Sequence, residues 1–190
     1  MTVQPSTVAM TGGTRERALA VALDMFSRDG YDHISMREIA EELGVTKAAL
    51  YHHFTSKEEI ARELIGGYLG AVNELVDWAR ATEPALPDLL SRWADLVRTQ
   101  GLAVGKFIHA NQRVVRELGL HPGEGRRAVD LVADAVVGVG QAPELRMQVR
   151  MALICLHTAA IAAEGLGMPD DEVFALAQQV AATIVRNAAG

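Results

Sequence analysis

Apolar residues recur three and four positions apart along most of this chain, which is the spacing of an α-helix with one buried face. No segment shows the alternation of apolar and polar residues that is typical of a half-buried β-strand. Gly and Pro residues separate many of the periodic segments. The pattern predicts an all-α fold with helices over residues 14–29, 36–43, 47–54, 57–82, 87–100, 102–118, 126–139, 143–165 and 171–188, of which 102–118 can divide into two short helices.

Residues 35–57 carry the most specific signals for helix ends. Ser35 and Glu38 have capping-box spacing, in which each side chain accepts a hydrogen bond from the backbone amide of the other residue. Gly44 stands where a left-handed residue ends a helix, and Thr46 can cap the start of the next one. The segment is therefore predicted to fold as a helix, a tight turn and a second short helix.

The second of these helices is expected to bury one side and to present the other to a ligand. Leu50 and Phe54 are four residues apart and should pack inward. A small, basic and aromatic outer surface suits the major groove of DNA, where Lys47 can donate to a guanine edge or a phosphate. The outward residues are Lys47, Ala48, Ala49, Tyr51, His52 and His53.

Further side chains near this helix can fix its position on DNA by donating to phosphates. Arg37, Tyr51, His52 and Lys57 carry suitable N–H or O–H groups. An alternative interpretation is that Tyr51, His52 and their neighbours form an ordinary aromatic cluster that covers a small three-helix core.

Residues 14–60 resemble the DNA-binding domain of the tetracycline-repressor (TetR) family of transcription regulators. The resemblance covers about a quarter of the chain. It rests on the segments Phe26–Tyr31, Ser35–Ala40, Leu43–Thr46 and Ala49–Glu59, which agree in order, spacing and identity.

The resemblance implies an all-helical dimer that binds operator DNA with this domain and a small-molecule effector with the remainder. This chain has Ala48 and Ala49 where relatives often carry a Gly or a polar residue. Readout of DNA shape therefore remains an alternative to direct base readout. The positions that commonly contact DNA in the family match Arg37, Thr46, Lys47, Ala49, Tyr51, His52 and Lys57.

The chain is expected to divide into three parts. These are a disordered tail at 1–13, a three-helix helix-turn-helix domain at 14–60, and a helical-bundle domain for effector binding and dimerisation at 61–190. The helix over 57–82 should connect the two domains. A second capping box is predicted to start it, and three glycines in its interior either admit a close neighbouring helix or allow a bend. The residues concerned are Ser56, Glu59, Gly66, Gly67 and Gly70.

The last two predicted helices carry apolar stripes that can form half of an intermolecular four-helix bundle. The TetR resemblance also implies that the final two helices make the dimer. The alternative is that both stripes face the core of a single protomer. The predicted interface consists of Val149, Leu153, Leu156, Ala160, Ala163, Val173, Ala177, Val180, Ala181 and Ile184.

A ligand pocket is expected within the 61–190 domain. Small-molecule sites combine an apolar lining with a few polar groups, although each candidate can equally be an ordinary core residue. The candidates are Trp78, Trp93, Phe107, His109, Asn111, Met147, Met151 and His157.

Composition narrows the function further. Apolar residues make up 49% of the 190 residues and aromatic residues 5%, which favours closely packed helices. The net charge is −6, and residues 1–63 carry seven Arg or Lys against ten acids, a net charge of −3. The basic surface typical of nucleic-acid binders is absent, so we expect weak affinity for random DNA and a modest salt dependence.

Other classes of protein fit the sequence poorly. The six histidines show no metal-ligand spacing and no phosphate-binding loop follows a strand, so no metal, cofactor or enzymatic activity is expected. The start of the chain lacks the pattern of a signal peptide, and the longest apolar stretch, 151–163, is too short and too interrupted to cross a bilayer. A cytoplasmic protein without a membrane partner is therefore expected.

Two functional hypotheses remain. The first is a dimeric repressor that a small-molecule effector releases from its operator. The second is a DNA-binding architectural or effector-independent regulator of the same fold.

Overall fold

The computed structural model describes residues 13–119, 124–137 and 140–186, and within these ranges it contains helices and no strand. Most of the predicted tail lies outside the described residues. The all-α class is confirmed. The chain forms two compact units that divide after Glu63, where the sequence placed a domain boundary after residue 60.

The first unit is built from three helices and the start of a fourth. These are α1 (Thr14–Arg28), the short 3₁₀ turn η1 (Tyr31–His33), α2 (Met36–Leu43), α3 (Lys47–His53) and the beginning of α4 (Lys57–Thr82). Their apolar faces meet in one core, as the helical spacing of the apolar residues predicted. Its fully or almost fully buried side chains include Ala18, Ala22, Phe26, Ile39, Leu50 and Phe54.

The predicted helix ends around α2 and α3 are confirmed. The Glu38 amide donates to Ser35 Oγ over 3.3 Å, and the Ser35 amide donates to the Glu38 carboxylate over 2.8 Å. The Ser35 hydroxyl also donates to the Glu38 carboxylate, over 2.7 Å, and this bond together with that from the Ser35 amide lowers the pKa of Glu38. Gly44 has φ 74°, which favours glycine, and the Ala49 amide donates to Thr46 Oγ1 over 3.1 Å.

The second predicted capping box differs from the expected one. The Glu59 amide donates to Ser56 Oγ over 3.3 Å, as expected. The Glu59 carboxylate, however, accepts from the amide and the hydroxyl of Thr55, over 2.6 and 2.7 Å, instead of from the Ser56 amide. The start of α4 is therefore fixed by Thr55 and Ser56 together, because Thr55 binds the Glu59 carboxylate and Ser56 binds the Glu59 amide.

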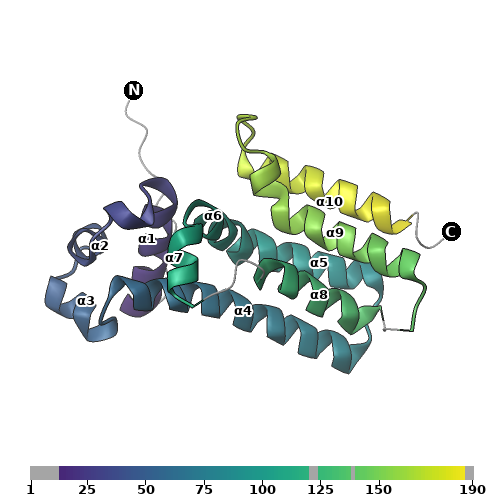
Figure 1. Cartoon of the computed structure of the whole chain (residues 1–190), viewed down its shortest axis with the longest axis horizontal. Helices are drawn as coiled ribbons and strands as arrows, with labels where there is room; N and C mark the ends of the chain where they lie inside the picture. The colour runs from purple at the N-terminus through teal and green to yellow at the C-terminus, as the bar shows by residue number, and fades with distance from the viewer. Residues whose placement is uncertain (1–12, 120–123, 138–139, 187–190) are drawn as a thin grey trace. The chain divides into compact units, whose positions relative to one another are not determined.

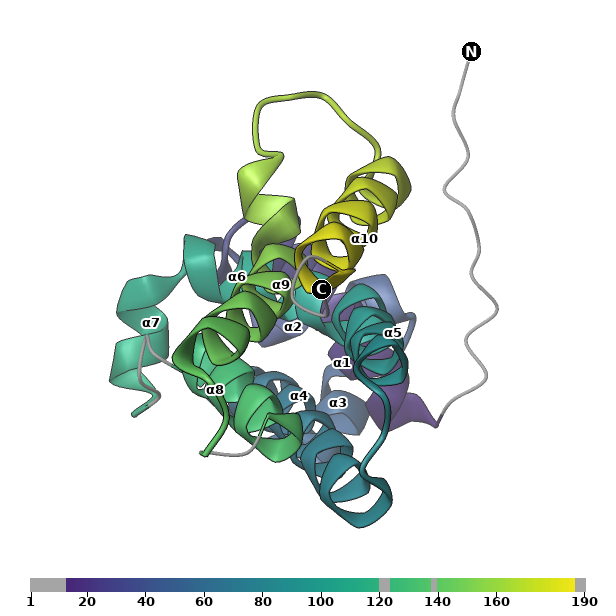
Figure 2. The ribbon, with the colours of Figure 1, turned by 90° about the vertical axis from the view of Figure 1, so that its right-hand side faces the viewer.

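The second unit continues α4 and adds seven further helical segments among the described residues. In this unit α9 lies between α8 and α10 and also contacts α5 and α6 (Figures 1 and 2). The segments are α5 (Leu86–Leu96), the π-helical turn η2 (Val97–Gly101), α6 (Leu102–Ala110), α7 (Gln112–Glu117), α8 (Glu124–Val136), α9 (Pro143–Ala162) and α10 (Asp170–Arg186).

Two details of this unit refine the sequence prediction. The division of 102–118 into two helices is confirmed, because Asn111 leaves helical geometry with φ −122° and ψ 37°. The helix predicted over 87–100 instead ends at Leu96 and passes into η2.

The π-helical turn is associated with a close approach of α4. A Cβ on Gly101 would lie 3.1 Å from the ring of Tyr68 and 3.3 Å from a methyl of Val97. Tyr68 is buried, and its hydroxyl lies 3.1 Å from His157 Nδ1, within hydrogen-bonding distance. The absence of a side chain at Gly101 therefore allows the Tyr68 ring to approach η2.

The glycines inside α4 have a different environment. A Cβ at Gly66, Gly67 or Gly70 would meet no atom within 4 Å. The expectation that they admit a close neighbouring helix is therefore wrong for a single protomer, and the helix remains continuous through all three.

We expect Gly101→Ala to lower the free energy of unfolding, because the Tyr68 ring cannot retreat without losing its contact with His157. Gly66→Ala is the matched control, since it adds a methyl group in open space within a helix and should raise stability by roughly 0.5–1 kcal/mol. Urea denaturation of both variants measures the difference. Equal stabilisation by the two substitutions would contradict the assigned role of Gly101.

Candidate DNA-binding surface and ligand cavity

The outer side of α3 forms an exposed surface of the first unit. Leu50 is fully buried, and Phe54, which follows the helix, is fully buried as well. With these two residues fixed inward, the opposite side of the helix faces solvent. We call the residues Thr46, Lys47, Ala48, Ala49, Tyr51 and His52 the reader surface; Ala49 is half-buried and the others are exposed.

Two of the candidate cations are oriented by neighbouring side chains. Lys47 Nζ lies 5.4 Å from the centre of the Tyr51 ring, which is within cation–π range. Arg37 Nε donates to the Glu41 carboxylate over 2.7 Å, and this contact raises the pKa of Arg37. Both members of that ion pair are exposed, so exchanging Glu41 for a phosphate would cost Arg37 little.

Lys57 has a structural role that the sequence did not suggest. Its ammonium donates to the backbone carbonyls of Tyr31, over 2.7 Å, and Ile34, over 2.8 Å. It also lies 4.1 Å from the centre of the Tyr31 ring, and burial lowers its pKa. Two of its three protons therefore bind the turn before α2, and the contact of Lys57 with a phosphate stays a prediction.

The second unit contains a cavity of about 280 Å³ between α4, α6, α7, α8 and α9. At its wall Tyr68 and His157 form a ring cluster with Trp93, whose ring centre lies 6.0 Å from that of His157. Burial lowers the pKa of His157, which favours the neutral imidazole. The lining, which we call the His157 cavity, is Ile65, Tyr68, Leu69, Gly105, Ile108, His109, Gln112, Val115, Arg126, His157, Thr158 and Ile161.

The predicted pocket residues are divided among three environments. His109 and His157 line the His157 cavity. Met147 and Met151 are 64% and 48% exposed on α9, so their placement in a pocket was wrong.

The other four candidates contact protein groups instead. Trp93 and Phe107 are fully buried, and the Trp93 indole donates to the Leu153 carbonyl over 3.1 Å. The Asn111 amide donates to the Phe107 carbonyl over 2.9 Å. Trp78 is half-buried, with the Arg92 guanidinium 4.0 Å from its ring centre. None of these four lines the His157 cavity.

Most of the predicted dimer residues lie inside the protomer. The side chain of Ala160 lies outside the described set, Ala163 and Ile184 are half-buried, and Val180 is 43% exposed. The assignment of the remaining residues to an intermolecular surface was wrong, because α9 and α10 pack these sides into the unit's own core. They are Val149, Leu153, Leu156, Val173, Ala177 and Ala181.

A different side of the same two helices is apolar and exposed. On α9, Met147, Met151 and Ile154 recur at four and three residues, and on α10 Leu176 and Val180 are four apart. Each of the five side chains is at least 43% exposed. We call them the outer stripe; exposed apolar side chains grouped on neighbouring helices are typical of protein interfaces.

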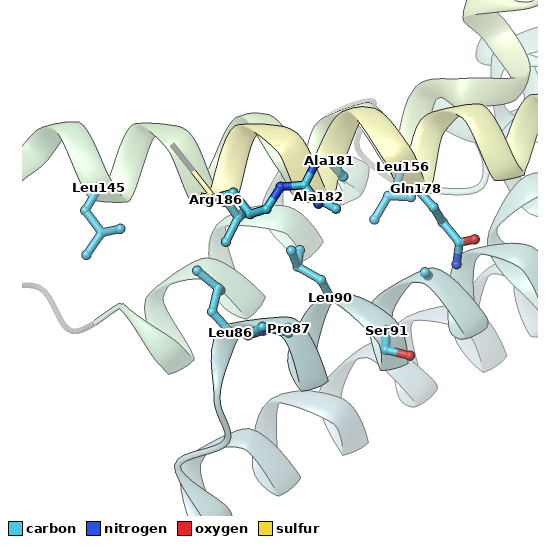
Figure 3. Close-up of a pocket in the computed structure, with 12 residues that line it drawn as sticks. Leu86, Pro87, Leu90, Ser91, Leu145, Leu156, Gln178, Ala181, Ala182 and Arg186 are labelled. Atoms are coloured by element: carbon cyan, nitrogen blue, oxygen red, sulfur yellow. The ribbon is translucent and has the colours of Figure 1, made fainter. Parts of the chain in front are cut away.

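The sequence analysis missed Tyr68 and a second cavity, of about 680 Å³, between α5, α9 and α10 (Figure 3). The lining comes from three helices that are distant in sequence, so helical periodicity gave no signal for it. This apolar groove is lined by Leu86, Pro87, Leu90, Ser91, Ala94, Leu145, Leu156, Gln178, Ala181, Ala182, Val185 and Arg186.

Among the described residues, no helix combines the length and the apolar character needed to cross a membrane.

Comparison with known proteins gives relatives of one kind. The sequence profile of "Bacterial regulatory proteins, tetR family" matches residues 18–64. The chain is 36% identical over 93 residues to the HTH-type transcriptional repressor KstR2 of Mycobacterium tuberculosis, which is 49% of this chain and 42% of that protein. It is 43% identical over 51 residues to the regulator AcrR of Shigella flexneri, covering 27% of this chain and 24% of that protein.

The match to the first of these relatives is partial. The chain spans about half the length of the curated KstR2 repressors it matches, 42% of that from M. tuberculosis and 57% of that from Mycolicibacterium smegmatis. These relatives are transcription regulators and not enzymes, as the sequence analysis expected for this chain.

Solved structures match over nearly the whole chain. The ketosteroid transcriptional regulator KstR2 of M. tuberculosis has a TM-score of 0.63 at 21% identity, covering 94% of this chain and 96% of that one. The TetR-family regulator PfmR of Thermus thermophilus has a TM-score of 0.58 at 22% identity, covering 90% and 97%. The likeness extends the fold assignment beyond the segment that the profile matches.

Lys57→Met should lower the free energy of unfolding of the first unit by roughly 1–3 kcal/mol, because it removes charge-assisted hydrogen bonds to two carbonyls. Lys47→Met is the matched control, since Lys47 is exposed and contacts only the Tyr51 ring among the interactions described above. Thermal unfolding followed by circular dichroism measures both. The structural role of Lys57 is refuted if the two variants are equally stable.

Proposed function

We propose that this chain is a TetR-family transcription regulator, a dimeric repressor that leaves its operator when a small molecule binds its second unit. The observation that carries the proposal is the reader surface: a capped short helix with a buried inner side and an exposed outer side of small, basic and aromatic residues. A regulator of this kind acts on chromosomal DNA, so we place it in the cytoplasm.

The proposed DNA contacts follow from exposure and chemistry. Ala48 and Ala49 let α3 approach the floor of the major groove and can touch a thymine methyl, while Lys47 donates to a guanine edge. Arg37, Tyr51 and His52 donate to phosphates and fix the register. The amides of Thr46 and its neighbours at the start of α3 add donors without a side-chain charge. Lys57 is left out, because its ammonium is held by two carbonyls.

The proposed dimer forms through the outer stripe. Two reader helices that bind half-sites about one turn of DNA apart must be held in a fixed relation, and a two-fold dimer provides it. Burying the outer stripe removes exposed apolar surface from water on both protomers. The stripe occupies α9 and α10, the helices in which the sequence predicted dimerisation. It includes Val180 of the predicted interface, and its other members replace the predicted residues that the protomer buries.

The proposed effector site is the His157 cavity. Its walls are apolar and carry a few polar groups, among them the Tyr68 hydroxyl, His109 and the largely neutral His157. Tyr68 lies on α4, the helix that starts in the first unit directly after α3, so a ligand in this cavity would touch the element that is continuous with that unit. A coupling of about 1–3 kcal/mol between such sites is typical.

The effector's chemical class stays open, and a related protein suggests where to begin. A solved neighbour is described as a ketosteroid transcriptional regulator. Ketosteroids are therefore one class for a first screen of this chain, beside smaller polar and aromatic compounds suited to a cavity of about 280 Å³. Effector release is rejected, in favour of an effector-independent regulator, if saturating ligand in the cavity leaves operator affinity unchanged.

Selection from a random duplex pool should enrich a palindrome with two half-sites. On the selected operator, Lys47→Ala should weaken binding at least about tenfold, because each subunit loses a base-edge or phosphate contact. Lys106→Ala is the matched control: it removes the same charge from an exposed residue of the second unit that pairs with Asp170. Fluorescence anisotropy at fixed salt measures both. No enriched sequence from a folded dimer, or equal losses in the two variants, would refute the assigned reader.

Introducing charge into the outer stripe should dissociate the dimer. Met151→Glu and Val180→Glu each place a carboxylate at an apolar position that dimerisation would bury, at a cost of several kcal/mol. Thr99→Glu, at an exposed position in η2, is the control and should stay dimeric. Sedimentation velocity gives the association state, and circular dichroism verifies that the helices remain. A dimer that tolerates both stripe substitutions would place the interface elsewhere.

A further inference from the structure

The apolar groove between α5, α9 and α10 has the size and character of a ligand site. Its volume of about 680 Å³ lies within the range of roughly 300–1,000 Å³ that is common for small-molecule pockets. Figure 3 shows side chains of α5, among them Leu86, Leu90 and Ser91, facing a row from α10 that ends at Arg186. The His157 cavity has a separate lining, so the groove is a second site.

The charge of the groove is unbalanced. Arg186 is the single charged residue among those that line it. Its guanidinium donates to Thr183 Oγ1 over 2.9 Å, and it forms no ion pair with any residue that the structure describes. Ser91 and Gln178, the two neutral polar residues of the lining, are exposed and are free to bind a ligand at the rim.

We propose that this groove binds an amphipathic carboxylate, with its apolar body against the Leu and Val side chains and its carboxylate on Arg186. Removing apolar surface from water drives the binding of the body. The planar guanidinium can hold a carboxylate through two parallel hydrogen bonds, an arrangement that a cationic head group of the same size cannot adopt. The positive charge of Arg186 thus favours an anionic group, and the apolar lining of the groove favours an apolar body.

The groove and the outer stripe can be occupied together. Leu156, in the groove, is two residues from Ile154 of the stripe, and two residues rotate a helix by about 200°. Ala182 and Val180 are related in the same way on α10. The ligand and a second protomer therefore use opposite sides of the same two helices, and binding in the groove does not require the dimer to open.

Calorimetric titration of the full chain, without DNA, tests the proposal. Dodecanoate is the flexible probe and deoxycholate the rigid, fused-ring probe. Dodecyltrimethylammonium has the same chain length as dodecanoate and the opposite charge. All three are used below their micelle-forming concentrations. We expect at least one carboxylate to bind, with the cation at least about tenfold weaker. Binding of either carboxylate supports the proposal. The ratio of their two dissociation constants shows whether the groove prefers a flexible or a fused-ring apolar body.

Two variants locate the bound molecule. Arg186→Gln should weaken the carboxylate at least about tenfold, while Arg98→Gln, an exposed arginine outside the groove, should leave it unchanged. Ala182→Phe should fill the groove and abolish binding, whereas Gln179→Phe introduces the same side chain at an exposed position outside it and should leave binding unchanged. If the Ala182→Phe variant fails to fold, the Arg186→Gln variant, which adds no bulk, is sufficient to test whether the carboxylate binds at Arg186.

Three results would overturn the proposal: no binding of either carboxylate, equal affinity for the cationic probe, or binding that Arg186→Gln and Ala182→Phe leave intact. The last would place the molecule in another site, such as the His157 cavity. Because the titration contains no DNA, its outcome is independent of whether the protein is a repressor.

Discussion

The burial of Leu50 and Phe54 is the constraint on which the proposed function depends. Helix α3 has seven residues, and isolated helices shorter than about 12–15 residues are marginal in water. Its geometry must therefore come from packing against the first unit's core and from the Thr46 cap. Once these two side chains are fixed inward, the residues between and before them have to face outward. The reader surface is thus a consequence of the core beneath it.

The same core explains why two cations near the reader surface have structural roles. The Arg15 guanidinium lies 5.0 Å from the centre of the Phe54 ring and pairs with Glu63, which connects α1 to the end of α3 and to α4. Lys57 binds the carbonyls of the turn before α2. Both charges bind groups within the domain. With a net charge of −3 over residues 1–63, the unit has few cations left for phosphates, so the proposed DNA binding would draw much of its affinity from the close fit of α3.

Local sequence signals predicted the helices of the first unit well, but contacts between residues distant in sequence could not be predicted. The two residues of a capping pair, such as Ser35 and Glu38, lie within four residues of each other in the sequence. They can therefore be recognised without knowing the fold. By contrast, α9 is apolar on two sides, with Leu153 on one and Met151 on the other. Periodicity cannot tell which side the rest of the protomer covers. The interface was therefore placed on the buried side, and Lys57 looked like a free cation because its carbonyl partners are more than twenty residues away.

The helix α4 joins the two proposed events. Lys57 at its start binds the turn before α2, and Tyr68, about three helical turns further on, contacts His157 at the wall of the proposed effector cavity. A ligand that displaces Tyr68 would act on a helix whose other end is already tied to the reader's core. Between them lie Gly66 and Gly67, where an added Cβ would meet no atom within 4 Å and where each glycine costs about 1 kcal/mol relative to Ala in a helix. Their backbone freedom makes this stretch the easiest part of α4 to deform. The proposed switch therefore requires that ligand binding shift α4 as a whole. A local bend at these glycines would leave the part of α4 in the first unit in place.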